Sequence, residues 1–321
     1  MEEIKIKAEQ KELNTERKTL DALLKSSARL KTFIKNEIKA DAAEFGDARR
    51  TPIVERDESK AFSQTALLST APITIVLSDR GWVRAAKGHE VDPTSLQYKS
   101  GDSFKLAARG KSNQLAIFMD STGRAYSFPA HSLPSARGQG EPVSGRANPP
   151  SGATFEGVVI GEDDKDVLLA SNAGYGFVGK VGDLISNKKS GKAVLRCPKG
   201  SKVLPTLVIS DYEKNLVVSV SNEGRMLMFP TAELPRLAKG KGNKIINIPT
   251  TRVTDGVEFV AAIAVLAPED DLIVYAGRRH HRLRASDLEH YRGERGRRGN
   301  KLPRGFQNVD RIEVSGKDAA E

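Results

Sequence analysis

Residues 216–229 read Leu-Val-Val-Ser-Val-Ser-Asn-Glu-Gly-Arg-Met-Leu-Met-Phe, and this stretch defines the structural unit of the chain. An apolar, β-branched run at 216–220 and a second apolar run at 226–229 flank a polar turn that contains Gly224. Two such runs joined by a short glycine turn predict a β-hairpin, because glycine accepts the backbone conformation that tight hairpin turns need.

The same pattern occurs five times. The other copies are residues 73–83, 115–128, 167–178 and 272–283. The turn glycines of the first four are spaced by roughly 40–50 residues, the period of propeller blades: Gly81, Gly123, Gly174 and Gly224. Five units of about four strands each predict a mainly β, five-bladed ring, closed or open. A solenoid and two unrelated β domains are the alternatives.

The first 45 residues differ from the rest, since they contain neither glycine nor proline. Apolar residues such as Leu13 and Leu20 recur at nearly 3.5-residue spacing, which predicts one long amphipathic helix, half of a coiled coil. Gly46 and Pro52 end it. The predicted organisation is a helical segment at 1–50, a linker at 51–70 with a strand at 65–69, the β domain at 71–316 and a tail at 317–321.

Composition points to an anionic partner. The 321 residues carry a net charge of +10, with 38% hydrophobic and 29% charged residues. Cys197 is the only cysteine, which excludes an intrachain disulfide and a cysteine metal cluster. The N-terminus lacks the apolar core of a signal peptide, and no run approaches the ~20 apolar residues of a membrane span. We expect a cytoplasmic, nucleoid-associated protein.

Basic loops repeat with the hairpins. After each of the second to fifth hairpins, a short link ending in leucine leads to a basic, glycine-containing loop: 137–140, 188–192, 239–242 and 292–299. Equivalent loops of a ring occupy equivalent places, so these charges are expected along one edge. Glycine lets the backbone approach a phosphate, while Lys and Arg supply the charge.

The fifth unit is the most basic, because residues 278–304 hold ten Lys or Arg against three Asp or Glu. Aromatic residues make up only 6% of the chain, which disfavours base stacking and favours the backbone of duplex DNA. The residues predicted to contact DNA are Arg80, Arg84, Arg124, Arg137, Lys180, Lys188, Lys189, Lys192, Arg225, Lys239, Lys241, Arg278, Arg279, Arg282, Arg284, Arg295, Arg297 and Arg298.

No catalytic or metal-binding residue is assigned. The chain contains no Walker loop, nucleophile elbow or zinc motif. His280 and His281 could suggest a metal, but adjacent residues of a strand face opposite sides of the sheet. Asp163, Asp164 and Asp166 are interpreted as an acidic connection between strands and not as a cation site.

Several strings resemble one family. Residues 41–52, DAAEFGDARRTP, resemble the end of the coiled-coil arm in the topoisomerase A subunits of the bacterial type IIA class. Residues 88–93 (GHEVDP), 98–104 (YKSGDSF) and 133–142 (LPSARGQGEP) resemble ParC, the topoisomerase IV form of these proteins. The resemblance covers essentially the whole chain.

The resemblance implies a β-pinwheel, a propeller-like ring whose blades exchange strands, that binds the transported duplex. It implies an enzyme that uses ATP and Mg²⁺ to decatenate DNA and relax supercoils, with ParE, the other topoisomerase IV polypeptide, as partner. A MukB-type condensin is a further expected partner. The breakage tyrosine belongs to an upstream domain that this chain lacks, so the chain is expected to be inactive alone, with no cofactor of its own.

One departure from the family leaves alternatives open. The gyrase relative, GyrA, carries a Gln-Arg-Arg-Gly-Gly-Arg-Gly-like box with its first blade, and residues 98–102 of this chain, YKSGD, do not match it. The similar run 295–299 lies in the last unit. The departure favours bending over full wrapping of DNA. A gyrase-type wrapping domain and a protein-binding propeller scaffold remain the alternatives.

Overall fold

The computed structural model describes residues 2–48, 50–51 and 70–316, and the chain divides into two compact units, Met1–Ala61 and Phe62–Glu321. Most of the predicted linker, its strand at 65–69, Pro52 and the tail at 317–321 lie outside the described residues. No helix of the described part is long and apolar enough to cross a bilayer.

The first unit contains two helices, α1 (Glu2–Leu24) and α2 (Ser27–Phe45), where the sequence predicted one. The prediction fails at Ser26, which has extended backbone angles (φ −131°, ψ 109°) and whose hydroxyl accepts a hydrogen bond from the Arg29 N–H. Serine at this position caps the second helix and so separates it from the first. The predicted end is confirmed, since the Gly46 N–H donates to the Ala42 carbonyl beyond Phe45.

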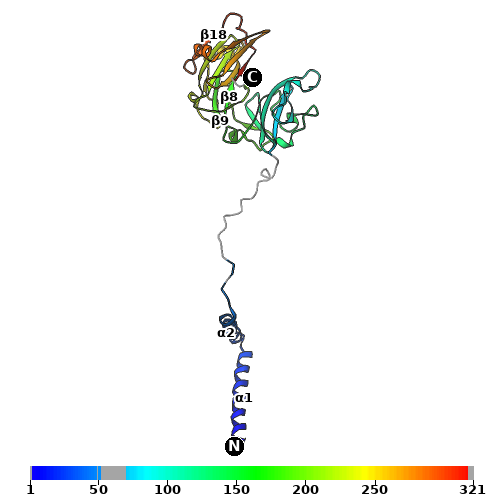
Figure 1. The fold of residues 1–321 in the computed structure, drawn as a ribbon, viewed down its shortest axis with the longest axis vertical. Coiled ribbons are helices and arrows are strands. Elements are labelled where there is room, and N and C mark those ends of the chain that lie inside the picture. Colours follow the sequence, from blue (N-terminus) through cyan, green and yellow to red (C-terminus); the bar gives the residue numbers. More distant parts are fainter. Residues whose placement is uncertain (1, 49, 52–69, 317–321) are drawn as a thin grey trace. The chain divides into compact units, whose positions relative to one another are not determined.

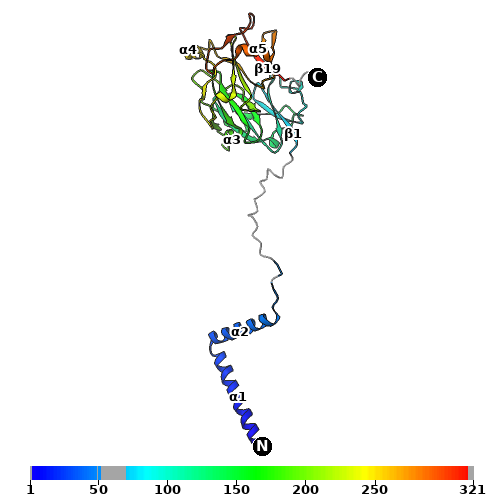
Figure 2. The ribbon, with the colours of Figure 1, turned by 60° about the vertical axis from the view of Figure 1, so that its left-hand side comes forward.

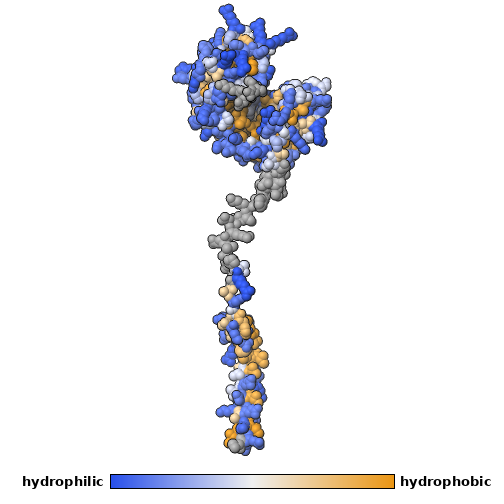
Figure 3. All heavy atoms as spheres, in the orientation of Figure 1, coloured by the Kyte–Doolittle hydropathy of each residue, from blue (hydrophilic) through white to orange (hydrophobic). Residues whose placement is uncertain are grey.

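Neither helix buries a residue within this unit, and Figure 3 shows apolar surface along both. The exposed large apolar side chains are Ile4, Ile6, Leu13, Leu20, Leu24, Leu30, Phe33, Ile34, Ile38 and Phe45. Apolar positions at helical spacing normally face another helix. The coiled-coil pairing of this segment stays a prediction.

The second unit contains the five predicted hairpins (Figures 1 and 2). They are β1 (Pro72–Ser78) with β2 (Trp82–Lys87), β4 (Leu115–Asp120) with β5 (Arg124–Pro129), β8 (Asp166–Ser171) with β9 (Tyr175–Lys180), β12 (Leu216–Ser221) with β13 (Arg225–Pro230), and β16 (Asp271–Ala276) with β17 (Arg279–Leu283). All five pair antiparallel, which confirms the sequence prediction.

A third strand pairs with the first strand of each hairpin. These strands are β3 (Phe104–Lys111), β7 (Phe155–Ile160), β11 (Leu207–Ile209), β15 (Val260–Leu266) and β19 (Arg311–Ser315). They contact one another between sheets, β3 with β7 and β15 with both β11 and β19, so they form the inner side of the arrangement.

The second strand of each of the first four hairpins receives a two-residue strand from the following unit. These crossing strands are β6 (Glu141–Pro142), β10 (Lys192–Ala193), β14 (Asn243–Lys244) and β18 (Asn300–Lys301). The resulting blades are β3-β1-β2-β6, β10-β5-β4-β7, β11-β8-β9-β14 and β15-β12-β13-β18, followed by the three-stranded fifth blade β17-β16-β19. The blades thus exchange strands, as the family resemblance implies.

The hairpin strands are apolar on both faces because alternate residues pack into two different cores. Ala116 and Phe118 of β4 pack between blades 1 and 2, while Ile117 and Met119 pack between blades 2 and 3. Two further cores join blades 3 and 4 and blades 4 and 5. Strands buried on both faces need continuous apolar runs, which is the pattern that the sequence shows.

The fifth blade lacks a crossing strand because the first unit has a short connection. Only 16 residues, 88–103, join β2 to β3, whereas 25 to 29 residues separate the equivalent strands of the other units. Residues 88–103 stay on their own blade, where the Asp102 carboxylate accepts from the Ser78 hydroxyl and the Arg80 N–H. Within the described residues, no sheet and no buried cluster joins blade 5 to blade 1.

Short helices occupy the connections. They are α3 (Val181–Leu184), α4 (Thr250–Thr254) and α5 (Ala285–Leu288), with 3-10 turns η2 (Pro93–Ser95), η3 (Ala130–Ser132), η4 (Val143–Gly145), η5 (Thr231–Glu233) and η6 (Glu289–Tyr291). Each predicted link ends in a buried leucine: Leu133, Leu184, Leu234 and Leu288. These leucines anchor the start of each crossing segment in a core between two blades.

Replacing Gly242 by alanine should destabilise the second unit. Gly242 has φ +74° immediately before β14, and an added Cβ would lie 2.1 Å from the Gly176 carbonyl oxygen of the strand that β14 covers. The strained conformation and the clash together should cost more than about 2 kcal/mol of unfolding free energy. Thermal unfolding measures it. Gly138→Ala is the control, because its added Cβ meets nothing closer than 3.9 Å; equal losses would contradict the prediction.

Candidate nucleic-acid interface

The basic loops bulge outward because each is held at both ends on one strand of the preceding blade. In the fourth unit, Arg236 forms a parallel bridge with Val178 and Asn243 pairs with Gly176, so residues 237–242 must protrude from β9. Residues 293–299 protrude from β13 in the same way, between Arg292 beside Met228 and Asn300 beside Met226.

The first two loops follow the same plan. Residues 136–140 protrude from β2 between Ser135, which bridges to Ala85, and Glu141, which pairs with Val83. In the third unit, the Ser186 N–H donates to the Ser127 hydroxyl and Lys192 pairs with Ala125, so residues 187–191 protrude from β5. The four loops therefore occupy equivalent places, as the repeat predicted.

Backbone hydrogen bonds join these loops in series. The Asn148 N–H donates to the Lys189 carbonyl (2.7 Å), and the Arg196 N–H donates to the Gly240 carbonyl (2.8 Å). The Asn247 N–H donates to the Arg297 carbonyl at 2.9 Å. We call the joined segments 137–148, 188–196, 239–247 and 292–299 the loop belt.

The loop belt concentrates the positive charge of the chain. Its four segments contain thirteen Lys and Arg and two Glu, a net charge of +11, against +10 for all 321 residues. The rest of the chain is therefore close to neutral. A continuous ridge of backbone turns carrying an excess of cations is a surface suited to a polyanion.

The predicted residues differ in how free their charges are. Arg80, Arg137, Lys180, Lys188, Lys189, Lys239, Arg278, Arg279 and Arg284 are exposed, and their side chains form no ion pair among the described residues. The Lys192 Nζ donates to the Asp183 carbonyl, and the Lys241 Nζ lies 3.7 Å from the centre of the Tyr175 ring. Both remain cationic.

Three predicted arginines hold the loops in place. The Arg124 Nη1 donates to the Ser190 carbonyl (3.1 Å), and the Arg225 Nη1 donates to the Gly299 carbonyl (3.3 Å). The Arg84 Nη1 donates to the Gly138 carbonyl (3.2 Å), while its guanidinium lies over the Tyr98 ring. Arg84 is only 4% exposed, so its prediction as a DNA-contacting residue is corrected: burial removes its charge from the surface.

Several arginines of the fifth unit are also engaged within the fold. The Arg295 Nη1 donates to the Lys244 carbonyl, and Arg297 pairs with Glu294 on the surface. Arg282 pairs with Asp271 at 2.8 Å. Desolvation opposes ionisation of Asp271, but hydrogen bonds from Arg282 and from the Ala285 N–H outweigh it, so the pKa of Asp271 lies below its ordinary value.

Arg298 belongs to a buried ion-pair network. Its Nη2 lies 2.6 Å from Oε2 of Glu258, which is fully buried, and the Arg252 Nε contacts the same oxygen at 3.0 Å. Arg252 also pairs with Glu223 of the fourth hairpin turn. The network ties the fifth loop to blade 4, so the count of arginines in the fifth unit overstates its free charge.

Sequence reasoning missed Arg196. It follows the crossing strand β10, its side chain is exposed and it forms no ion pair within the described part of the chain. It lies outside the glycine-containing string 188–192, which is why the loop motif did not include it. The hydrogen bond from its backbone N–H to Gly240 identifies it as part of the loop belt.

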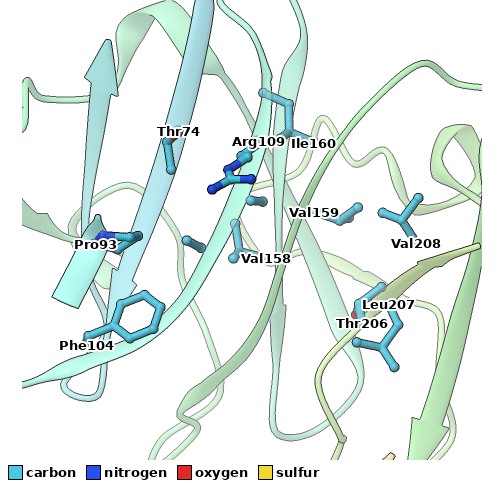
Figure 4. Close-up of a pocket in the computed structure, with 12 residues that line it drawn as sticks. Thr74, Pro93, Phe104, Arg109, Val158, Val159, Ile160, Thr206, Leu207 and Val208 are labelled. Atoms are coloured by element: carbon cyan, nitrogen blue, oxygen red, sulfur yellow. The ribbon is translucent and has the colours of Figure 1, made fainter. Parts of the chain in front are cut away.

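A separate cavity lies at the inner side of the blades, away from the loop belt (Figure 4). It measures about 490 Å³ and is lined by residues of β3, β7 and the β11 region, including Val158, Leu207 and Val208. Arg109 is the single cationic side chain among its described lining residues. In the described residues, no group of three or more His, Cys, Asp or Glu could hold a metal ion.

Comparison with known proteins finds one family. Residues 165–210 and 215–267 match the family described as DNA gyrase C-terminal domain, beta-propeller. The chain is 54% identical over 314 residues to the DNA topoisomerase 4 A polypeptide of Pseudomonas aeruginosa and 48% identical to that of Escherichia coli K12. Each alignment covers 98% of this chain, which spans 42% of the length of either relative.

Solved structures agree. The structure of the E. coli ParC C-terminal domain matches with a TM-score of 0.67 at 48% identity, over 77% of this chain and 99% of that one. A DNA gyrase A C-terminal domain matches with a TM-score of 0.56 at 14% identity, over 77% of this chain and 83% of that one. The second likeness concerns the fold alone.

Replacing Glu258 by glutamine should destabilise the attachment of the fifth loop to blade 4. Arg252 and Arg298 would lose their shared counter-ion, and removing one partner of a buried pair costs about 3–5 kcal/mol when both are buried. Because both arginines are partly exposed, we expect about 2 kcal/mol, measured by denaturant unfolding. The exposed pair gives the control, Glu294→Gln, with a loss below about 0.5 kcal/mol. Indistinguishable variants would contradict this account.

Proposed function

Because this chain belongs to the family of topoisomerase IV ParC C-terminal domains, we propose that its second unit binds duplex DNA along the loop belt. The observation that carries the proposal is the joining of four basic loops by backbone hydrogen bonds into one ridge of net charge +11. Such a ridge follows a phosphate backbone without reading bases, since cations and N–H groups on turns position a duplex but carry no sequence information.

We propose bending of the duplex in preference to a full wrap. The fifth blade has no crossing strand, so the ridge of joined loops ends at residues 292–299 and does not return to the first blade within the described residues. A duplex that follows an interrupted ridge gains fewer contacts to offset the energy of bending. Full gyrase-type wrapping remains the second candidate, supported by the match to the gyrase family.

For the whole protein we propose ATP-dependent decatenation and relaxation of supercoils at the nucleoid, together with ParE. ATP and Mg²⁺ would then bind outside this segment, which supplies DNA binding alone. We also propose a MukB-type condensin as a partner that competes with DNA for the loop belt. These proposals rest on family membership, and the chain spans 42% of its curated relatives.

Removing free cations from the loop belt should weaken DNA binding and its salt dependence together. We expect the triple variant Arg137→Ala, Lys188→Ala, Lys189→Ala to reduce the slope of log K against log salt by about 2–3, because each lost phosphate contact releases about 0.9 fewer counter-ions. Gel-shift titrations of a duplex at several salt concentrations measure it.

The matched control removes three exposed lysines from the helices: Lys11, Lys18 and Lys35, each changed to alanine. The control should retain the slope of the unmodified chain. If both triple variants lose the same slope, the net charge of the chain binds DNA and the loop belt has no special role.

Ligation of nicked circles around the bound protein should distinguish bending from wrapping. We expect a linking-number change well below one per bound chain, because an open ridge bends the duplex without completing a superhelical turn. Topoisomer distributions after ligation and deproteinisation measure it. A shift approaching one per bound chain would favour the gyrase-type wrapping domain.

A further inference from the structure

The loop belt contains a groove of about 760 Å³ where the loops of the third and fourth units meet. Four cationic residues line it: Arg124, Arg196, Lys239 and Lys241. No acidic residue is among the described residues that line it. Arg196 and Lys239 are exposed and form no ion pair with the described part of the chain, so their charges are free to meet an anion.

Apolar groups make up the rest of the groove. Pro150, Ala193, Leu195 and Cys197 line it beside the cations. A site for a bare anion has no use for apolar contacts, whereas a nucleic-acid strand presents deoxyribose carbons between its phosphates. The mixed lining therefore suits one sugar-phosphate strand, with its sugars on the apolar part and its phosphates at the cations.

The groove is held in shape by backbone hydrogen bonds between its walls. The Arg196 N–H donates to the Gly240 carbonyl, and the Gly240 N–H donates to the Val194 carbonyl at 2.9 Å. Arg124 is fixed by its bond to the Ser190 carbonyl. A preformed site binds with little ordering cost, whereas side chains on an exposed hairpin must be immobilised on binding.

The hairpin of the fifth unit offers the contrast. Arg278 and Arg279 are exposed at its turn, and the two-residue connection there leaves them on a protruding tip. None of the described cavities includes either residue. The local excess of arginine therefore contributes long-range attraction more than a fitted contact.

We propose that this groove, and not the arginine-rich fifth hairpin, is the main anchor for one strand of the bound duplex, with Arg196 and Lys239 on successive phosphates. The inference rests on the proposed function, since it assumes that the loop belt binds duplex DNA. It places the anchor at the junction of the loops of units 3 and 4.

Cys197 allows a direct test in the unmodified chain, because it is the only cysteine and lines the groove. Burial, with a smaller contribution from Asp120, raises the pKa of its thiol to about 11, so alkylation by uncharged iodoacetamide is slow and can be followed at about pH 9. We expect saturating duplex to slow alkylation at least about fivefold at low salt, and high salt to restore the rate as DNA dissociates.

Two double variants that remove equal charge complete the test. Arg196→Ala with Lys239→Ala should weaken duplex binding about tenfold or more, and Arg278→Ala with Arg279→Ala about threefold or less. Gel shifts at one salt concentration compare them. Deoxyadenosine monophosphate, tested alone, should leave the alkylation rate unchanged at concentrations where the duplex protects.

The outcomes separate this inference from the proposed function. If duplex binds but Cys197 is alkylated at the same rate, or if the fifth-hairpin variant loses as much affinity as the groove variant, the anchor is elsewhere and the proposed function stands. Protection by the mononucleotide but not by the duplex would make the groove a free-nucleotide site and overturn the inference. If no duplex binds even at low salt, the proposed function fails and the inference fails with it.

Discussion

The outer edge of each second hairpin strand must be paired, and in four of five blades the next unit of the chain supplies the pairing. This constraint determines where the basic loops lie. A segment that attaches beside Val178 and again beside Gly176 has to expel the residues between, and those residues carry the charge. Successive segments then bond to each other, as Arg196 does to Gly240. The same pairing that completes the sheets therefore aligns the cations along one ridge.

Arginine serves two purposes in this chain, and a count of charges cannot separate them. Arg84 and Arg298 are consumed in holding loops and blades together, one against a carbonyl and an aromatic ring, the other against the buried carboxylate of Glu258. Lys188 and Lys189 project from the same kind of loop with their charges free. The densest basic string, in the fifth unit, is for this reason not the strongest candidate surface, while the less conspicuous Arg196 lies in a formed groove.

The hairpins and the blade number could be predicted from sequence because apolar runs and turn glycines are local signals. The crossing strands could not, since two residues such as Asn243 and Lys244 show no periodicity and their partner lies in another unit. The helix break at Ser26 was missed because apolar spacing continues past the cap. Burial of Arg84 was missed because an arginine beside a turn is typically exposed. Position in the repeat located the site, but which cations are free depends on tertiary contacts.

The direction of strand exchange has a consequence for synthesis on the ribosome. A chain emerges from its N-terminus, and each of the first four blades needs a strand from the unit that follows it. Every nascent blade must therefore wait with one edge open until the next hairpin and its loop have been translated, and only then does it close. Assembly is vectorial, with each unit acting as the clasp for its predecessor. The last blade, which has no successor among the described residues, keeps in the finished protein the open edge that the others show only in passing.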